Sequence, residues 1–363
     1  MPFRVTNTQQ SCIHLYYRIG RRRSQPQSER FNERRFSGNK IDLATVTHLD
    51  FERSIAEVEE QIETLQDQAR ERGLDLSDEL RSLERKLYSL KREVYRNLTP
   101  IERVQVARAA RRPYTLDYLE MLFDDFVELH GDRMYRDDES IVGGWARLDG
   151  ESVMVIGHQK GRDMKENIRR NFGMPHPEGY RKSLRLMSLA AKFHRPVVTL
   201  IDTPGAYPGF GAEERGQAEA IARNLREMIV LPVPTIAVVI GEGGSGGALA
   251  IGVTDRILML ENSVYSVISP EGCAAILWRT DSARDKAAAA LRMTAVDLHN
   301  FGIVDEVVPE PAGGAHSDWE RTSEDLGEAI ARHLRELRDF DTDELLRRRT
   351  DKYLSIGEWR TDD

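Results

Sequence analysis

The feature that most constrains this chain is a run of glycines between two apolar segments. Five of the seven residues from Gly241 to Gly247 are glycine. The run follows the apolar stretch 234–240, which has the pattern of a buried strand, and precedes the small-residue stretch 248–252, which is typical of a helix start. Glycine allows another molecule to approach the backbone closely. A strand, a glycine turn and a helix N-terminus together aim N–H groups at one point, where negative charge is stabilised.

Two nucleotide-binding interpretations of this run compete with a tight turn that holds no ligand. A P-loop requires Lys and then Ser or Thr after its last glycine, but this chain has Gly-Ala there. The dinucleotide pattern G-x-G-x-x-G is satisfied by Gly241, Gly243 and Gly246. Glu261 lies where a ribose-binding acid is expected. A Rossmann-type dinucleotide-binding protein is therefore the alternative function for this chain.

A second glycine turn precedes the first one along the chain. Residues 202–213 contain three glycines and two prolines, and they follow the apolar segment 197–202. A helical pattern over residues 218–228 comes next. Two successive strand–turn–helix units indicate an α/β fold that builds one site from both turns.

Further segments share a longer pattern with these two turns. They are residues 113–117, 141–144, 157–162, 171–175, 202–227, 241–252, 265–273 and 309–316. In this order they resemble the carboxyltransferase alpha subunit of bacterial-type, multisubunit acetyl-CoA carboxylase, and the resemblance extends roughly from Leu49 to the C-terminus. It implies a crotonase-like (ClpP/crotonase) fold, a spiral of ββα units with an N-terminal helical hairpin. Periodicity alone predicts only an α/β fold.

The resemblance also implies an activity and a site. The family transfers the carboxyl group of carboxybiotin to acetyl-CoA and yields malonyl-CoA, the first committed step of fatty acid biosynthesis. Carried over by position, Gly246 and Gly247 are the catalytic glycines whose backbone amides stabilise an oxyanion. The substrate-binding residues expected from the two turns are Gly205, Ala206, Tyr207, Gly243 and Gly244.

The same resemblance implies that the chain works in an assembly. Its partner is expected to be a carboxyltransferase beta subunit, which carries zinc, in an α2β2 heterotetramer. A biotin carboxyl carrier protein and an ATP-dependent biotin carboxylase complete the enzyme. No Met-Lys-Met biotinylation motif occurs in this sequence. Carboxybiotin and acetyl-CoA are therefore expected as substrates, with no covalently bound cofactor and no metal in this chain.

Charge and cysteine content exclude several other function classes. The net charge is −8, although the first 40 residues hold nine Lys or Arg and only two acidic residues. The acidic remainder argues against nucleic-acid binding, and no apolar run approaches the length of a membrane span. Cys12 and Cys273 form no C-x-x-C zinc motif, and Cys273 is expected to be a buried small residue.

Four parts are predicted along the chain. Residues 1–46 are rich in Arg, Gln and Ser and are expected to form a disordered basic extension. This stretch also fits a transit peptide or an upstream start assignment, so the expected location is the cytoplasm, or the plastid stroma with a transit peptide. Residues 47–110 are expected to form the helical hairpin, 111–316 the carboxyltransferase domain and 317–363 charged helices.

Local patterns give sharper structural expectations. Heptad spacing places Leu83 and Leu87 in a buried seam between the two helices of the hairpin. Thr115 is predicted to cap a helix whose apolar face reaches Phe126. The dipeptide Asp149-Gly150 predicts a turn between two paired strands.

The segment 158–182 is dense in Lys and Arg, although it lies in an acidic part of the chain. Three interpretations are open for it: it binds the phosphates of coenzyme A, contacts another subunit, or forms a solvated helix face with salt bridges. His158 at its start is interpreted as a structural histidine rather than a general base.

Overall fold

The structure is a computed structural model that describes residues 48–357. From Leu49 onward, these residues belong to one compact unit. Residues 1–46, predicted to be a disordered basic extension, lie outside the described residues, and so does Cys12.

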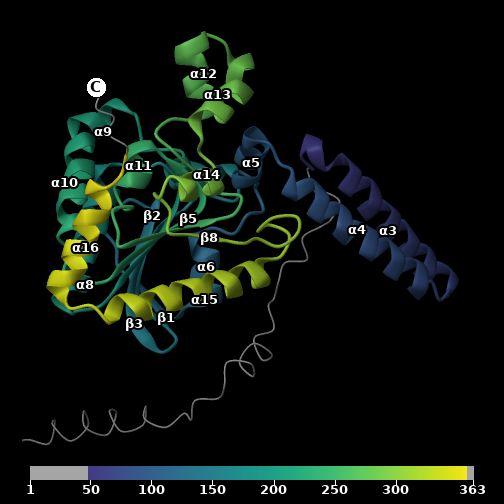
Figure 1. Cartoon of the computed structure of the whole chain (residues 1–363), viewed down its shortest axis with the longest axis horizontal. Helices are drawn as coiled ribbons and strands as arrows, with labels where there is room; N and C mark the ends of the chain where they lie inside the picture. Colours follow the sequence, from purple (N-terminus) through teal and green to yellow (C-terminus); the bar gives the residue numbers. More distant parts are fainter. Residues whose placement is uncertain (1–47, 358–363) are drawn as a thin grey trace, which may run out of the picture. The chain divides into compact units, whose positions relative to one another are not determined.

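A single sheet forms the centre of this unit (Figure 1), and within residues 48–357 its strand order is β1-β2-β3-β4-β5-β6-β8, with β7 beside β5. The first three strands pair antiparallel, and all pairs from β3 to β8 are parallel. The parallel strands therefore end at one common edge. The bounds are β1 (Asp124–Glu128), β2 (Ile141–Leu148), β3 (Glu151–His158), β4 (Val197–Thr203), β5 (Thr235–Gly244), β6 (Arg256–Leu260), β7 (Val264–Ser266) and β8 (Glu306–Val308).

Helices cover both faces of the sheet. On one face, α6 (Thr115–Leu122) and α15 (Trp319–Arg338) pack against alternate residues of the central strands. On the other face, α8 (Pro177–Lys192) and α10 (Gln217–Ile229) pack against the remaining ones. Every residue of β4 is buried, as expected for a parallel strand that is covered twice. The predicted α/β architecture is confirmed.

The N-terminal hairpin is also confirmed. It consists of α3 (Arg53–Arg72) and α4 (Ser77–Arg96), and it continues through α5 (Pro100–Ala107) into the sheet-containing body. Gly73 ends α3 in a left-handed conformation, with φ of 63°. Leu83 and Leu87 are only half-buried, so the expectation of a fully buried seam is wrong for this chain by itself.

Two further local expectations have different outcomes. The residues Asp149 and Gly150 both have positive φ, 51° and 82°, and they join β2 to β3 as the sequence predicts. Thr115 is not the cap of α6. Tyr114 occupies that position, and its N–H donates to Asp117 Oδ2 at 2.6 Å. The buried Thr115 hydroxyl instead donates to the carbonyl oxygen of His158 at 2.6 Å, and α6 ends before Phe126, which lies in β1.

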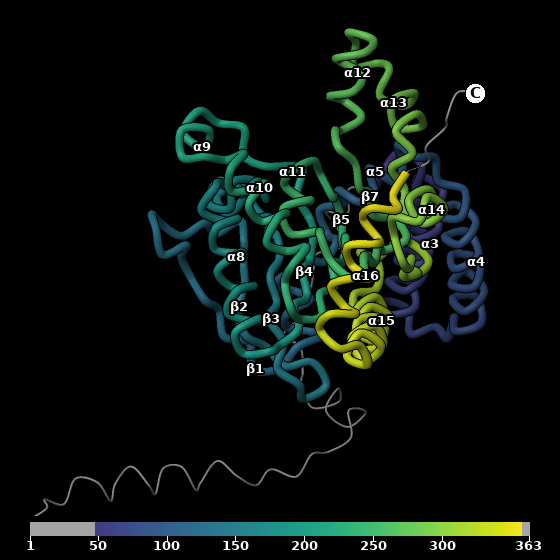
Figure 2. Tube along the Cα trace, turned by 60° about the vertical axis from the view of Figure 1, so that its left-hand side comes forward, coloured from purple at the N-terminus to yellow at the C-terminus, as the bar shows by residue number. Residues whose placement is uncertain are grey.

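The edge at which the parallel strands end carries several short helices. Figures 1 and 2 both show α12 and α13 projecting from the body beyond this edge, and Figure 2 shows α9 and α11 there too. Within residues 48–357, no helix is both long and apolar enough to cross a membrane. The remaining helices are α7 (Met164–Arg169), α9 (Phe210–Glu214), α11 (Ser245–Leu249), α12 (Pro270–Trp278), α13 (Arg284–Leu291), α14 (Ala295–Asn300) and α16 (Thr342–Leu354), with 3-10 turns at Asp50–Glu52, Asn171–Gly173 and Asp281–Ala283.

Candidate active site at the ends of β4 and β5

The two glycine turns lie directly against each other. A Cβ atom on Gly247 would lie 2.5 Å from the carbonyl carbon of Gly205 and 2.6 Å from the nitrogen of Ala206. A Cβ atom on Gly244 would lie 2.2 Å from the carbonyl oxygen of Pro204. Any side chain at either glycine would push the turns apart, so the glycines are what allows the two backbones to meet. The structure thus brings the predicted residues of both turns together.

The glycine run itself is mostly strand. β5 continues through Gly244, with Gly243 opposite both Thr203 and Tyr265 and Gly244 opposite Ser266. The expectation of a glycine turn over the whole run is therefore wrong, because its first half, Gly241 to Gly244, belongs to the sheet. The chain changes direction at Ser245, whose φ is 52°.

Gly246 and Gly247 begin the helix α11 directly after this change of direction. The first N–H groups of a helix have no acceptor within that helix. The amides of Ser245, Gly246 and Gly247, the first three residues of α11, are therefore the ones in the run whose position suits donation to an incoming oxygen.

The turn after β4 has its donors committed to the protein. Thr203 Oγ1 accepts from the Gly205 N–H at 3.0 Å and donates to the Gly205 carbonyl at 2.7 Å. The Tyr207 N–H donates to the Pro175 carbonyl at 3.0 Å. Gln217 Nε2 donates to the carbonyls of Pro175 and Tyr207, each at 2.9 Å. The amides of Gly205 and Tyr207 therefore already donate hydrogen bonds within the protein. This turn can support the neighbouring glycine turn, but it does not offer these two amides to a substrate.

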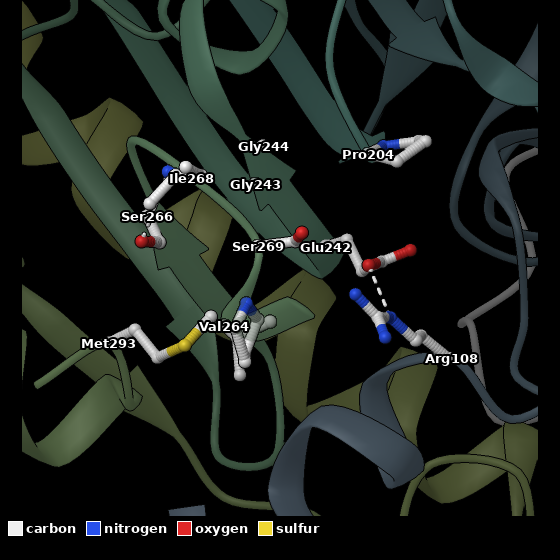
Figure 3. A pocket seen from close by; sticks show the side chains of 11 residues that line it. Arg108, Pro204, Glu242, Gly243, Gly244, Val264, Ser266, Ile268, Ser269 and Met293 are labelled. Carbon is white, nitrogen blue, oxygen red and sulfur yellow. Dashed lines mark hydrogen bonds and ion pairs between the residues drawn. The ribbon is translucent and has the colours of Figure 1, made fainter. Parts of the chain in front are cut away.

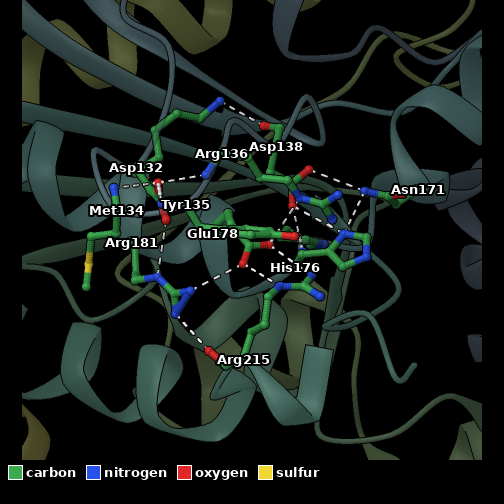
Figure 4. Close-up of polar contacts among 12 residues, drawn as sticks. Asp132, Met134, Tyr135, Arg136, Asp138, Asn171, His176, Glu178, Arg181 and Arg215 are labelled. Carbon is green, nitrogen blue, oxygen red and sulfur yellow. Dashed lines mark hydrogen bonds and ion pairs between the residues drawn. The ribbon is translucent and has the colours of Figure 1, made fainter. Parts of the chain in front are cut away.

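A polar cluster supports the far end of the same turn (Figure 4). The His176 ring stacks on the Tyr207 ring with 4.2 Å between centroids. The backbone N–H of His176 donates to Asp138 Oδ2 at 2.6 Å. The carboxylate of Glu178 is buried, and burial alone would raise its pKa, but Arg215 at 2.7 Å lowers that pKa below the ordinary value. The sequence did not predict this cluster of Asp138, His176, Glu178 and Arg215, because these residues lie far apart along the chain.

A chain of charges lies at the ends of β4 and β5, with Lys160, Asp202 and Glu242 largely buried and Arg108 and Glu271 partly exposed. Lys160 Nζ is 2.7 Å from Asp202 Oδ1 and 3.0 Å from Glu242 Oε2. Arg108 Nε is 2.6 Å from Glu242 Oε1, and Arg108 Nη1 is 2.7 Å from Glu271 Oε1 at the start of α12. Burial opposes the charge on Glu242, but Lys160 and Arg108 together lower its pKa below the ordinary range. Two of these three carboxylates, Asp202 and Glu242, lie within two residues of the ends of β4 and β5.

A shallow pocket opens beside this network (Figure 3). Two of the predicted substrate-binding residues, Gly243 and Gly244, line it together with Pro204 of the other turn. Gly246, Gly247 and the residues 205–207 lie at the junction of the turns and are not part of this lining. The other lining residues are Arg108, Glu242, Val264, Ser266, Ile268, Ser269, Pro270 and Met293.

Part of the basic segment 158–182 forms ion pairs in the protein interior, and part of it is exposed. Lys182 is fully buried, with Nζ 2.6 Å from Asp137 Oδ1, and the largely buried Arg170 lies 3.0 Å from Glu166. A solvated helix face is therefore the wrong interpretation for Lys182 and Arg170. It holds for α7, where Lys165 and Arg169 are exposed and Arg169 lies 3.4 Å from Glu166. His158 is fully buried, and burial lowers its pKa to about 3, so the ring is neutral at physiological pH. A neutral ring suits a structural residue and a general base alike, so the structural interpretation stays a prediction.

The strand order does not support the dinucleotide-binding alternative. Rossmann-type folds bind at a point where the strand order reverses. Here β3, β4, β5, β6 and β8 follow one another in chain order within the described sheet. The carboxylate of Glu261 accepts the N–H of Glu310 at 3.2 Å, which gives the side chain a structural partner.

Comparison with known proteins identifies the family. The model of the family described as acetyl co-enzyme A carboxylase carboxyltransferase-like matches residues 48–357. The chain belongs to this carboxyltransferase family. Similar relatives are each named acetyl-coenzyme A carboxylase carboxyl transferase subunit alpha. The one from Gemmatimonas aurantiaca is 60% identical over 320 residues, which cover 87% of this chain and 99% of the relative. The one from Thermus thermophilus is 56% identical over 309 residues, which cover 85% and 98%.

Solved structures support the fold of this carboxyltransferase. The 12S transcarboxylase, crystallised with methylmalonyl-coenzyme A and methylmalonic acid, superposes with a TM-score of 0.51 at 20% identity. The match covers 71% of this chain and 46% of that one, so this chain spans less than half of the solved protein. The predicted crotonase-like fold is confirmed. Among residues 48–357, there is no cluster of three or more His, Cys, Asp or Glu side chains placed to hold a metal ion.

Proposed function

We propose that this chain is the alpha subunit of an acetyl-CoA carboxylase carboxyltransferase, which moves the carboxyl group of carboxybiotin to acetyl-CoA and yields malonyl-CoA. The observation that carries the proposal is the 60% identity to a relative of that name over 99% of the relative's length. Such similarity extends through both glycine turns and the helices that support them. We further propose that this reaction is the first committed step of fatty acid biosynthesis and that it takes place in the cytoplasm.

The chemistry of the transfer needs donors for negative charge. The bond between the biotin nitrogen and the carboxyl carbon breaks, and a carbon–carbon bond forms at the methyl carbon of the thioester. Negative charge develops on the ureido oxygen of biotin and on the thioester enolate, and released biotin takes the methyl proton, so no protein base is required. Fixed N–H groups in a site shielded from water stabilise such charge without reorganising.

We assign the biotin side of this chemistry to Gly246 and Gly247. Their place in the first turn of α11 supports the assignment, because helix N-termini favour negative charge. We assign Gly205, Ala206 and Tyr207 to the neighbouring side of the substrate site, where hydrogen bonds of Gly205 and Tyr207 hold the backbone in place. Gly243 and Gly244 line the adjoining pocket.

The assembly proposed for this activity includes a zinc-bearing beta subunit in an α2β2 heterotetramer, a biotin carboxyl carrier protein and a biotin carboxylase. Large apolar side chains near the proposed site support a protein partner there. Phe210 on α9, Val267 before α12 and Ile276 on α12 are 78%, 76% and 69% exposed. Exposed apolar surface of this kind is typical of protein–protein interfaces.

The test is co-purification with a beta subunit, followed by assay of the reverse reaction from malonyl-CoA and a biotin derivative. We expect a stable complex that forms acetyl-CoA only when both substrates and both subunits are present. A stable complex without this activity would contradict the proposal.

A matched pair of variants locates the site. Gly246→Val adds a branched side chain at a proposed donor and should lose activity, whereas Ser245→Ala keeps every N–H of the turn and should retain activity.

A further inference from the structure

Lys160 lies where three neighbouring parallel strands end. It follows the last residue of β3 by two positions, and its ammonium group contacts one carboxylate from β4 and one from β5. Its side chain is 14% exposed. The backbone of Gly173 packs on its stem, since a Cβ there would lie 2.8 Å from Lys160 Cγ. Lys160 is thus held at its stem by Gly173 and at its ammonium group by two carboxylates. These contacts leave its side chain few other conformations.

The pairing of β4 with β5 is irregular at the same place. Ile201 lies opposite Val239, but Thr203 lies opposite Gly243, so two residues along β4 correspond to four along β5. The regular ladder of backbone hydrogen bonds is interrupted there, as it is at any bulge. The backbone alone therefore does not fix how far the end of β5 extends past the end of β4.

Side chains fill this gap in the ladder. Asp202 Oδ1 accepts the N–H of Glu242 at 3.0 Å, and the same oxygen receives Lys160 at 2.7 Å. A Cβ on Gly241 would lie 2.5 Å from Asp202 Oδ1, so only glycine admits the carboxylate at this point. Asp202 lies near the end of β4 and Glu242 near the end of β5. Because Lys160 pairs with both carboxylates, it links the turn after β4 to the turn after β5.

We propose that Lys160 is a positioning residue that sets the spacing between the turn after β4 and the turn after β5, and thereby the aim of the Gly246 and Gly247 amides. This inference rests on the proposed function for its effect on catalysis. Lys160 itself contacts neither turn glycine through its ammonium group, and it acts through Asp202 and Glu242. Arg108 holds the other oxygen of Glu242 (Figure 3), so the carboxylate is fixed from two sides.

The test removes the clamp without leaving a buried charge unbalanced. In Lys160→Met combined with Asp202→Asn, one positive and one negative charge are lost together, and Asn can still accept the N–H of Glu242. We expect the alpha–beta complex to assemble and to melt within a few degrees of the parent. The kcat should fall by about 10²-fold, the loss expected for a misplacement of about 1 Å. The KM values should change little, because the amides act on charge that develops in the transition state.

A matched control lies at the opposite edge of the sheet. Lys352 is also 14% exposed and lies 2.5 Å from Asp305, which accepts the N–H of Ile257 just as Asp202 accepts that of Glu242. Lys352→Met with Asp305→Asn should leave kcat within about twofold of the parent, since a change away from the site misplaces no donor. Equal losses of kcat in both double variants, or parental kcat in the first, would overturn the positioning role.

Two further measurements cover the other outcomes. If the first double variant does not fold, Lys160→Gln replaces it, and parental kcat in that variant would overturn the inference. Hydrogen exchange of residues 241–249 should speed up in the Lys160 variant and not in the control, whether or not the complex is active. A parent complex without carboxyltransferase activity would refute the proposed function alone, and unchanged exchange in residues 241–249 would refute the clamp alone.

Discussion

The turn after β4 and the turn after β5 resemble each other in sequence and differ in structure. Both follow a buried strand, and both contain several glycines. The first turn is closed by its own contacts, because Thr203, Pro175 and Gln217 pair with its backbone groups. The second passes directly from strand to helix, since β5 ends at Gly244 and α11 begins at Ser245, whose φ is 52°.

This difference shows what a glycine pattern can and cannot predict. In both turns the glycines mark places where two backbones or a backbone and a side chain come close. They do not show which amides remain available, because this depends on acceptors supplied by distant parts of the chain. The first turn therefore acts as a support and the second as the proposed donor.

The largest effect is expected from Gly247→Val. Its Cβ would collide with the backbone of Gly205 and Ala206, so the change disturbs the donor turn and its support together. The loss of an oxyanion donor typically lowers turnover by about 10²–10³-fold, and we expect at least that loss in kcat of the alpha–beta complex. Activity within about tenfold of the parent would show that the contact between the turns is not needed for donation.

Thr203→Val tests the closed turn by itself. The variant keeps the shape of a fully buried residue and leaves the Gly205 N–H without its acceptor. An unpaired buried donor costs about 1–3 kcal/mol, so the free energy of unfolding should fall by that amount in a denaturant titration. Thr350→Val, at an exposed position of α16, is the control and should change it by less than about 0.5 kcal/mol. Equal effects at the two threonines would mean that the turn does not depend on this hydroxyl.

Gly246→Ala tests Gly246 of the donor turn independently of its neighbour Gly247. Its Cβ would meet only the Ile221 side chain, at 3.6 Å, which is an ordinary contact. Alanine favours helix over glycine by about 1 kcal/mol, so the melting temperature should stay the same or rise. We expect kcat to fall by about tenfold, less than for a lost donor, because the methyl group narrows the approach of the substrate oxygen. Parental kcat would move the site away from this residue.

The smallest effects are expected at Tyr207. Tyr207→Phe keeps the ring that stacks on His176 and should change neither stability nor kcat measurably. Tyr207→Ala removes the stack, which is worth about 0.5–1.5 kcal/mol beyond buried area, and should lower the melting temperature. A loss of kcat in Tyr207→Phe would assign the hydroxyl a role in substrate binding.

The sequence predicted much of the fold, and its errors have physical causes. The strands 197–202 and 234–240 were predicted from their apolar runs, and the turn at Asp149-Gly150 from its residue types. The extension of β5 to Gly244 was missed, because glycine is disfavoured in strands and the pairing with Thr203 of β4 and with β7 holds it there. The cap of α6 was misplaced because the hydroxyl of Thr115 found a buried carbonyl instead.

The site was predictable only in part. Family resemblance proposes Gly246 and Gly247 as donors, and the close approach of Gly205 and Ala206 explains why the second of them is glycine. The ion pairs of Lys160 could not be predicted, since its partners follow 42 and 82 residues later in the chain. Local patterns in a sequence predict which segments are buried, but not which charges meet at the ends of separate strands.

The interrupted ladder between β4 and β5 restricts how the length of this chain can vary. Side chains alternate between the two faces of a strand, so an excess of two residues keeps the alternation in phase, whereas an excess of one would invert it. The end of β5 has an excess of two, since Ile201 lies opposite Val239 and Thr203 lies opposite Gly243. Insertions or deletions between residues 239 and 243 can therefore be accommodated only if they change the length by an even number of residues. An odd number would exchange the faces of the sheet toward which Gly243 and Gly244 are directed.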